Sequence, residues 1–236
     1  MEARVHTAMQ ADTERFFRAS EYWRAWSRVP DLTADVGYAL LAVRPTDRWV
    51  LDIPCGHGRL LKAIRGLTPA ARLVGLDVNG EMVAQVRRDL EDVDAQVASV
   101  YAIPFRDRSF DVVLCHESFM HFDEPRAALD EVCRVSSDRV YFSVTTRRQL
   151  NTLLRRLGLL GESDVPHWTY NAEDLPSLLP DSYRWEMRGA FLLGHKALRL
   201  SHAAHALLHA AVGQHLPAAL LRRFGQTLFV YGTRRG

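Results

Sequence analysis

The sequence predicts an α/β fold: a doubly wound, mostly parallel sheet of seven strands, accompanied by helical cap elements. Three observations support this prediction. Between about residues 49 and 146, segments with the two-residue period of a strand alternate with segments that have the 3.6-residue period of a helix. With 236 residues, of which 47% are hydrophobic, the chain can bury a large core. It contains no internal repeat and no low-complexity linker, so a single domain over residues 1–236 is the simplest organisation.

The central part of the chain, residues 46–146, is expected to alternate five strands with three helices. The strands are expected at 49–55, 72–78, 95–100, 110–116 and 139–146, and the helices at 58–67, 81–92 and 124–135. Asn79 is expected to cap the second of these helices and Pro125 to begin the third. Strands and helices that alternate at this spacing are typical of a parallel sheet with right-handed crossovers.

Helical segments and two closing strands are expected outside this centre. The expected helical segments are an N-terminal cap over 1–45 and cap or insert regions over 147–182 and 195–223, the former including a short helix at 172–179. The two closing strands are expected at 183–193 and 226–233. They bring the sheet to seven strands.

The charge and cysteine content exclude several classes of protein. With 30 basic and 28 acidic residues the formal net charge is only +2, which argues against a nucleic-acid partner. The three cysteines are widely spaced and form no CxxC pair, so neither a disulfide framework nor a zinc ribbon is expected. No segment has the ~18 uninterrupted apolar residues of a membrane span, and residues 1–30 lack the features of a targeting peptide. A cytoplasmic protein without integral membrane association is therefore expected.

Three histidines in the expected helical insert raise the question of a metal site. His202, His205 and His209 are spaced so that they share one helix face. The opposite face of that helix is apolar, which favours a solvated position for the histidines. A metal site also needs more support than the surface of one helix provides. No metal is therefore expected.

The segment VLDIPCGHGRLL, residues 50–61, carries the strongest functional signal. Its strand ends at the acid Asp52, and Gly56 and Gly58 follow in the turn. In an open α/β sheet, ligands bind beyond the carboxyl ends of the strands, where a glycine turn lets the backbone approach them closely. Asp77 ends the second strand, 21 residues after Gly56, where an acid can accept hydrogen bonds from ribose hydroxyls.

Two features distinguish this turn from a dinucleotide site. Leu61 stands where a GxGxxG turn has its third small residue. Asp52 would repel a pyrophosphate, whereas it suits a ligand with a cationic amine. Adenosine, a ribose diol and an ammonium group occur together in S-adenosylmethionine, which is therefore the expected cofactor.

Residues 45–146 resemble the class I S-adenosylmethionine-dependent methyltransferases, which have a Rossmann-like fold. LDIPCGHG (51–58) is similar to the first motif of that family, Asp77 matches its acid at the end of the second strand, and VNGEMV (78–83) resembles the segment that packs against adenine. The resemblance implies that 46–146 is a cofactor-binding core. The implied cofactor-binding residues are Asp52, Pro54, Cys55, Gly56, Gly58, Asp77, Val78, Met82, Ser99, Val100 and His116. Ser99 replaces the family's Asp at the adenine amino group, so it can accept a hydrogen bond only without charge assistance.

Two histidines are candidates for catalysis. His116 follows the expected fourth strand, next to the expected methyl group, and its imidazole can act as a general base. An equally supported interpretation is that His116 only packs or offers its backbone to the cofactor. His121 lies where the family often carries a histidine, and a structural role is the favoured interpretation for it.

Aromatic residues in the expected cap are candidates for binding the methyl acceptor. These candidates are Tyr22, Trp23, Trp26, His167, Trp168 and Tyr170. The first three partly share a helix face, so core packing is the favoured alternative for them. If the aromatic residues line a pocket, they indicate a small acceptor that is aromatic or lipophilic.

The resemblance implies a methyltransferase that acts on O, N or activated C of a small-molecule metabolite. All but two of the 30 basic residues are arginine, which indicates a GC-rich bacterial genome and fits specialised metabolism. A quinone or lipid methyltransferase is one alternative, and a cofactor-binding protein that does not transfer methyl groups is another. Leu61 disfavours a nicotinamide oxidoreductase. The sequence indicates no oligomeric state.

Overall fold

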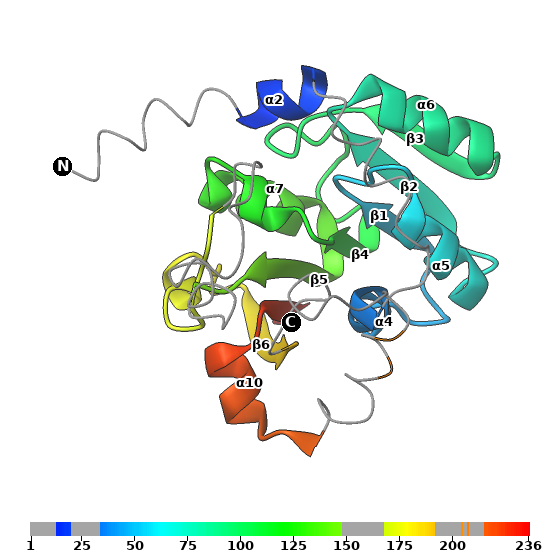
Figure 1. Ribbon diagram of the computed structural model, residues 1–236. Coiled ribbons are helices and arrows are strands. Elements are labelled where there is room, and N and C mark those ends of the chain that lie inside the picture. Colours follow the sequence, from blue (N-terminus) through cyan, green and yellow to red (C-terminus); the bar gives the residue numbers. More distant parts are fainter. Residues whose placement is uncertain (1–12, 20–33, 148–167, 192–203, 205–206, 208–214) are drawn as a thin grey trace.

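A single mixed sheet organises the protein in the computed structural model, which describes residues 13–19, 34–147, 168–191, 204, 207 and 215–236 (Figure 1). In this part of the chain seven strands follow the order β3-β2-β1-β4-β5-β7-β6. They are β1 Trp49–Asp52, β2 Arg72–Asp77, β3 Val93–Val97, β4 Phe110–Cys115, β5 Ser136–Thr145, β6 Tyr183–Ala190 and β7 Thr227–Arg234. The pairs among β1 to β5 are parallel, and β7 is antiparallel to both β5 and β6. The mostly parallel, seven-stranded sheet is thus confirmed.

Helices pack on both faces of this sheet (Figure 1). The described helices are α2 Thr13–Ala19, α4 Ala34–Leu40, α5 Arg59–Leu67, α6 Gly80–Asp89, α7 Pro125–Val135 and α10 Ala218–Phe224, with 3-10 turns η1 Phe119–His121 and η2 Leu175–Ser177. Buried apolar residues of α4, α5 and α6 belong to the core on one face, and those of α7 to the core on the other. The doubly wound arrangement expected from the sequence is therefore confirmed.

Two strands start earlier than expected. β3 begins at Val93 rather than at residue 95. β5 begins at Ser136 rather than at 139, because its register against β4 shifts: Phe110 pairs with Ser136, whereas Val112 pairs with Arg139. Such a bulge lets one strand carry an extra residue, which the alternation of side chains in the sequence does not reveal.

In the described residues 168–182 the chain is less helical than the sequence suggests. The helix expected at 172–179 is wrong, because the structure has only the three-residue turn η2 there. Pro176 lies in this turn, and proline inside an α-helix removes a hydrogen bond and clashes with the preceding turn. Most of the insert expected at 195–223 lies outside the described residues, including His202, His205 and His209.

The close packing of α5 on the sheet depends on a glycine in β2. A Cβ atom at Gly75 would lie 2.9 Å from Cδ1 of Leu61 and 3.0 Å from Sγ of Cys55. Leu61 is the large residue at the position where a dinucleotide turn has glycine or alanine. In this protein the small residue is Gly75 on the strand instead of a residue on the helix, and it leaves the space that the Leu61 side chain fills.

Gly75→Ala should lower the free energy of unfolding by about 1–3 kcal/mol, because it overpacks a filled core. Urea denaturation of the purified protein measures this loss. In a Leu61→Ala background the same substitution should cost clearly less, since the nearest obstructing atom is gone. Strictly additive losses in the double variant would show that the two side chains do not compete for this space.

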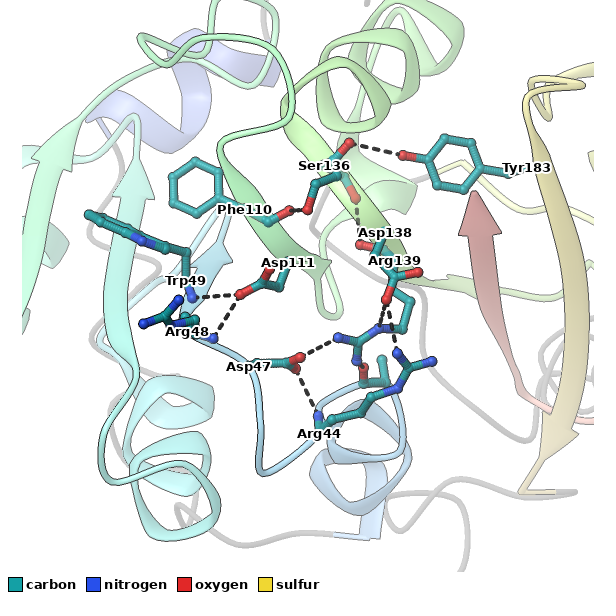
Figure 2. A network of polar contacts seen from close by, with 12 residues as sticks. Arg44, Asp47, Arg48, Trp49, Phe110, Asp111, Ser136, Asp138, Arg139 and Tyr183 are labelled. Carbon is teal, nitrogen blue, oxygen red and sulfur yellow. Dashed lines mark hydrogen bonds and ion pairs between the residues drawn. The ribbon is translucent and has the colours of Figure 1, made fainter. Parts of the chain in front are cut away.

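A polar network connects the amino-terminal ends of β1, β4 and β5 (Figure 2). This edge of the sheet is opposite to the edge at which these strands have their carboxyl ends. The buried guanidinium of Arg139, in β5, donates hydrogen bonds to the carboxylate of Asp47 and to the carbonyl oxygen of Ala42. The carboxylate of Asp111, in β4, accepts a hydrogen bond of 2.9 Å from the backbone N–H of Trp49 at the start of β1. The segment between α4 and β1 is thereby tied to β4 and β5.

Candidate active site

A cavity of about 200 Å³ lies at the carboxyl ends of β1 to β4. Its walls come from the segments that follow β1 (52–60), β2 (77–82), β3 (98–101) and β4 (116–122), and from Phe17 in α2. The strand order reverses between β1 and β4, and ligands of open α/β sheets bind at such a reversal. The segment that carries the first sequence motif therefore meets the end of β4 in one cavity.

The turn after β1 requires glycine at two positions. Gly56 and Gly58 both have a left-handed backbone, with φ of 52° and 83°. A Cβ atom at Gly58 would also lie 3.0 Å from Leu90 and 3.2 Å from Val86, so the start of α5 packs closely against the end of α6. Glycine adopts this backbone without the strain that other residues would carry.

Asp77 holds two turns together at the edge of the cavity. One carboxylate oxygen accepts a hydrogen bond of 2.9 Å from the N–H of Gly56, and the other accepts one of 2.8 Å from the N–H of Asn79. Burial raises the pKa of Asp77, and the hydrogen bonds from Asn79 and Gly56 oppose that rise. Each carboxylate oxygen has a second lone pair, so Asp77 can still accept hydrogen bonds from a ligand.

Asp52 is a buried carboxylate in the wall of the cavity. Its side chain is 1% exposed, and Oδ1 has no hydrogen-bond partner among the described residues. Burial, with the charge of Asp77 second, raises its pKa well above the usual range, while Arg59 lowers it. A buried carboxylate without a counter-charge is costly, so this position fits a ligand that carries a cation.

The segments after β2 and β3 provide the apolar wall of the cavity. Val78, Met82, Ser99 and Val100, the residues expected here to bind the cofactor, all line it. Tyr101, which was not expected at the site, lines it as well. The hydroxyl of Ser99 already accepts a hydrogen bond of 3.2 Å from the N–H of Tyr101. A hydroxyl oxygen retains one further lone pair and its own proton for a ligand.

Helix α2 and the cap of α6 meet over the cavity. The side chain of Asn79 accepts hydrogen bonds from the N–H groups of Glu81 and Met82, which confirms it as the N-cap of α6. Its amide nitrogen donates to the carbonyl oxygen of Phe17 over 2.8 Å. The Phe17 ring lies 4.9 Å from that of His121, and both rings line the cavity. No local pattern predicts a role for Phe17, because its contacts lie more than sixty residues away in the sequence.

His116 lines the cavity, but both of its ring nitrogens have partners in the protein. Nδ1 lies 3.0 Å from the hydroxyl of Tyr141, and Nε2 lies 3.0 Å from the carboxylate of Asp35. Arg59 forms an ion pair of 3.0 Å with Asp35 and lies 3.4 Å from Nε2. To act as a general base, His116 would have to release one of these partners. Asp35 and Tyr141 were not expected at the site.

Glu117 follows His116 and also lines the cavity. Its backbone is left-handed, with φ of 52°, and its N–H donates a hydrogen bond of 2.8 Å to the hydroxyl of Ser143 in β5. Burial, followed by the charge of Asp35, raises the pKa of Glu117, while His116, Arg59 and Ser143 lower it. Glu117 was not expected at the site, since nothing in the local sequence pattern distinguishes it from a surface acid.

The expected acceptor-binding residues are only partly described. Tyr22, Trp23, Trp26 and His167 lie outside the described residues. Trp168 donates a backbone hydrogen bond of 2.6 Å to the carbonyl oxygen of Met120, and the Tyr170 ring lies 6.0 Å from that of Phe119 in the core. Neither Trp168 nor Tyr170 is among the described residues that line the cavity.

The described ranges contain no group of three or more His, Cys, Asp or Glu side chains that could hold a metal ion. Nor does any helix in them have the length and apolar character needed to cross a membrane.

Comparison with known families identifies the central part of the chain. Residues 51–144 match a family model described as a methyltransferase domain. This part of the chain is therefore similar to methyltransferase domains. The match begins inside β1 and ends inside β5, so it includes all four segments after β1 to β4 that line the cavity.

Several curated proteins are similar to this domain. A demethylmenaquinone methyltransferase of Thermotoga maritima is 31% identical over 96 residues, which are 41% of this chain and 41% of that protein. An uncharacterised methyltransferase of Schizosaccharomyces pombe is 29% identical over 128 residues, 50% of this chain and 45% of that protein. The similarity thus spans less than half the length of these relatives.

Solved structures share the fold over almost the whole chain. The plantazolicin methyltransferase BamL, crystallised with a substrate analogue and S-adenosylhomocysteine, has a TM-score of 0.68 at 15% identity, over 99% of this chain and 98% of that one. An S-adenosylmethionine-dependent methyltransferase of Thermotoga maritima has a TM-score of 0.61 at 16% identity, over 94% and 98%. The chain therefore shares the fold of these methyltransferases.

Proposed function

We propose that this chain is an S-adenosylmethionine-dependent methyltransferase with a small-molecule acceptor. The observation that carries the proposal is Asp52, a buried cavity carboxylate whose Oδ1 has no partner among the described residues. A ligand ammonium group would supply both the hydrogen bond and the counter-charge. Asp77, in the neighbouring strand β2, retains acceptor capacity for ribose hydroxyls.

The remaining cavity residues fit the same ligand. Val78, Met82 and Val100 offer an apolar surface for an adenine ring, and Phe17 covers the cavity from α2. When bound, S-adenosylmethionine supplies an electrophilic methyl group. The chain's own contribution is to align the acceptor with that group, exclude water and accept a proton where the acceptor loses one.

The class of acceptor is supported by two observations. Methyltransferases similar to this chain are named for plantazolicin, demethylmenaquinone and magnesium protoporphyrin IX, which supports a small molecule. The aromatic rings of Phe17, Tyr101 and Phe122 in the cavity wall favour a flat or lipophilic one. A quinone or other lipid acceptor is the second candidate, favoured by the demethylmenaquinone and phthiotriol dimycocerosate methyltransferases among the relatives. The arginine-rich composition supports a role in bacterial specialised metabolism.

Isothermal titration calorimetry tests the class of ligand directly. S-adenosylmethionine and S-adenosylhomocysteine should both bind to the purified protein, whereas NAD should not. Binding of NAD in their place would contradict the proposal and support a nicotinamide oxidoreductase. A radiolabelled methyl group then reports transfer to candidate acceptors, which should include quinone precursors beside water-soluble metabolites.

Asp52→Asn should weaken binding of S-adenosylhomocysteine about tenfold or more, the range of a charge-assisted hydrogen bond. It should weaken 5′-methylthioadenosine much less, since that ligand has no amino-acid group. Asp94→Asn makes the same chemical change at an exposed position of β3 and should affect neither ligand. Equal losses for both ligands in Asp52→Asn would mean that Asp52 only shapes the turn.

A further inference from the structure

Glu117 occupies a distinctive position at the wall of the cavity. It lies two residues beyond the end of β4, and β4 pairs with β1 so that Leu114 is opposite Asp52. The segment that carries Glu117 therefore continues the strand next to the carboxylate that fits the ligand ammonium group. Among the loops after β1 to β4, this segment is the one not already assigned to the ammonium, ribose or adenine groups.

The backbone holds Glu117 in an unfavourable conformation. A left-handed backbone is strained for a residue with a Cβ atom, and such residues persist where the surroundings hold them in place. Here the holding contact is the hydrogen bond from the Glu117 N–H to the buried hydroxyl of Ser143. This contact with β5 fixes the backbone position from which the Glu117 side chain extends.

The charges around Glu117 leave it without an ion pair in the described part of the chain. The groups that face it are Asp35 from α4, Arg59 from α5, His116 from the end of β4, and Ser143 and Tyr141 from β5. Arg59 is paired with Asp35 at 3.0 Å, and Nε2 of His116 lies at the same distance from Asp35. The cationic and basic groups that face Glu117 are therefore shared with a competing carboxylate.

From this arrangement we infer that Glu117, rather than His116, takes up the proton that the acceptor loses when it is methylated. The inference rests on the proposed function. It applies to an acceptor whose nucleophile carries an N–H or O–H group. As the nucleophile forms its bond to the methyl carbon, the electron pair of the broken carbon–sulfur bond stays on sulfur, and the proton of the nucleophile passes to the Glu117 carboxylate. The proton later leaves to solvent.

His116 then acts as a positioning residue. Burial raises the pKa of Tyr141 well above its usual range, so its hydroxyl remains protonated and can donate to Nδ1 of His116. Nε2–H in turn donates to Asp35. This chain of contacts holds the segment before Glu117 against α4 and β5, and it keeps both ring nitrogens occupied.

The role of Glu117 can be tested by cofactor binding alone, without a methyl acceptor. A sulfonium is cationic and the thioether of S-adenosylhomocysteine is neutral, while the two ligands carry the same ammonium and carboxylate groups. If Glu117 faces the methyl position, the cation stabilises its ionised form and lowers its proton affinity. S-adenosylmethionine should therefore release up to about half a proton more than S-adenosylhomocysteine on binding, near the pKa of Glu117. The neutralisation of sulfur during transfer then restores the proton affinity of Glu117.

Calorimetric titrations in buffers of different ionisation enthalpy measure this difference. They should be made from the ordinary pKa of a glutamate upward, because burial raises the pKa of Glu117. In the wild type, the preference for S-adenosylmethionine over S-adenosylhomocysteine should be present above the raised pKa of Glu117 and should be lost as the pH falls through it. Glu117→Gln should abolish the difference in proton release and lower the preference about tenfold.

Glu124→Gln is the matched control, because it removes the same charge from an exposed side chain beside the same turn. It should retain the wild-type difference. A difference that survives in Glu117→Gln would assign the proton to His116 or Asp35 and overturn the role of Glu117. Equal proton release by both ligands in the wild type would overturn it without any variant. Binding of neither ligand would overturn the proposed function itself, and the role of Glu117 with it.

Discussion

Asp77→Ala is expected to weaken binding of S-adenosylmethionine and S-adenosylhomocysteine by about 2–4 kcal/mol. Charge-assisted hydrogen bonds contribute about 1.5–3 kcal/mol each, and two bonds to one ribose are not fully additive. The structure adds a second cause, because the carboxylate also holds the N–H groups of Gly56 and Asn79. The substitution therefore removes a ligand contact and loosens both turns that surround it.

Calorimetric titration measures the loss, and circular dichroism checks that the variant is folded. Because burial raises the pKa of Asp77, the wild-type affinity should also fall as the pH decreases through that pKa. Asp77→Asn separates the two causes, since its side-chain oxygen can still accept one backbone hydrogen bond. An affinity within about a factor of three of wild type in Asp77→Ala would remove Asp77 from the site.

Arg139→Met is expected to lower the free energy of unfolding by about 3–5 kcal/mol, the cost of removing one partner of a buried ion pair. Arg139 and Asp47 are 6% and 7% exposed, and they form an ion pair in the network at the amino-terminal edge of the sheet (Figure 2). The substitution leaves the Asp47 carboxylate buried without its counter-charge. It also leaves the carbonyl oxygen of Ala42 without the hydrogen bond from Arg139.

Arg126→Met provides the matched control for this measurement. Arg126 forms an ion pair of 3.0 Å with Asp130 one turn further along α7, and both side chains are 53% exposed. Exposed pairs of this kind contribute about 0.3–0.5 kcal/mol. In urea denaturation, Arg139→Met should therefore lower the free energy of unfolding several times more than Arg126→Met does. A loss below about 1 kcal/mol for Arg139→Met would mean that water or another group compensates Asp47.

The two replacements also test opposite edges of the same sheet. Arg139 lies near the start of β5, whereas Asp77 lies at the end of β2, where the cavity opens. Arg139→Met should therefore leave cofactor affinity nearly unchanged under conditions where the variant is folded. Asp77→Ala should act mainly on affinity, and less on stability.

The sequence by itself determined the part of this protein that depends on short-range pattern. Strand and helix periodicity predicts the alternating centre of the fold, because apolar residues recur with a different period in a strand and in a helix. Asp52, Gly56 and Asp77 could be identified in the same way. Asp52 and Asp77 end their strands and Gly56 lies in the turn after the first of them, and parallel strands all end at one edge of the sheet.

The tertiary structure alone decided which distant side chains surround these residues. His116 could be placed at the sheet edge from the sequence, but its partners Asp35 and Tyr141 lie 81 and 25 residues away. Phe17 and Glu117 enter the cavity through helix packing and through a single left-handed backbone position. Such contacts depend on the order of the strands and on how α2 and α4 pack against them. The periodicity of a segment predicts whether it forms a strand or a helix, but it does not predict which other segment will pack beside it.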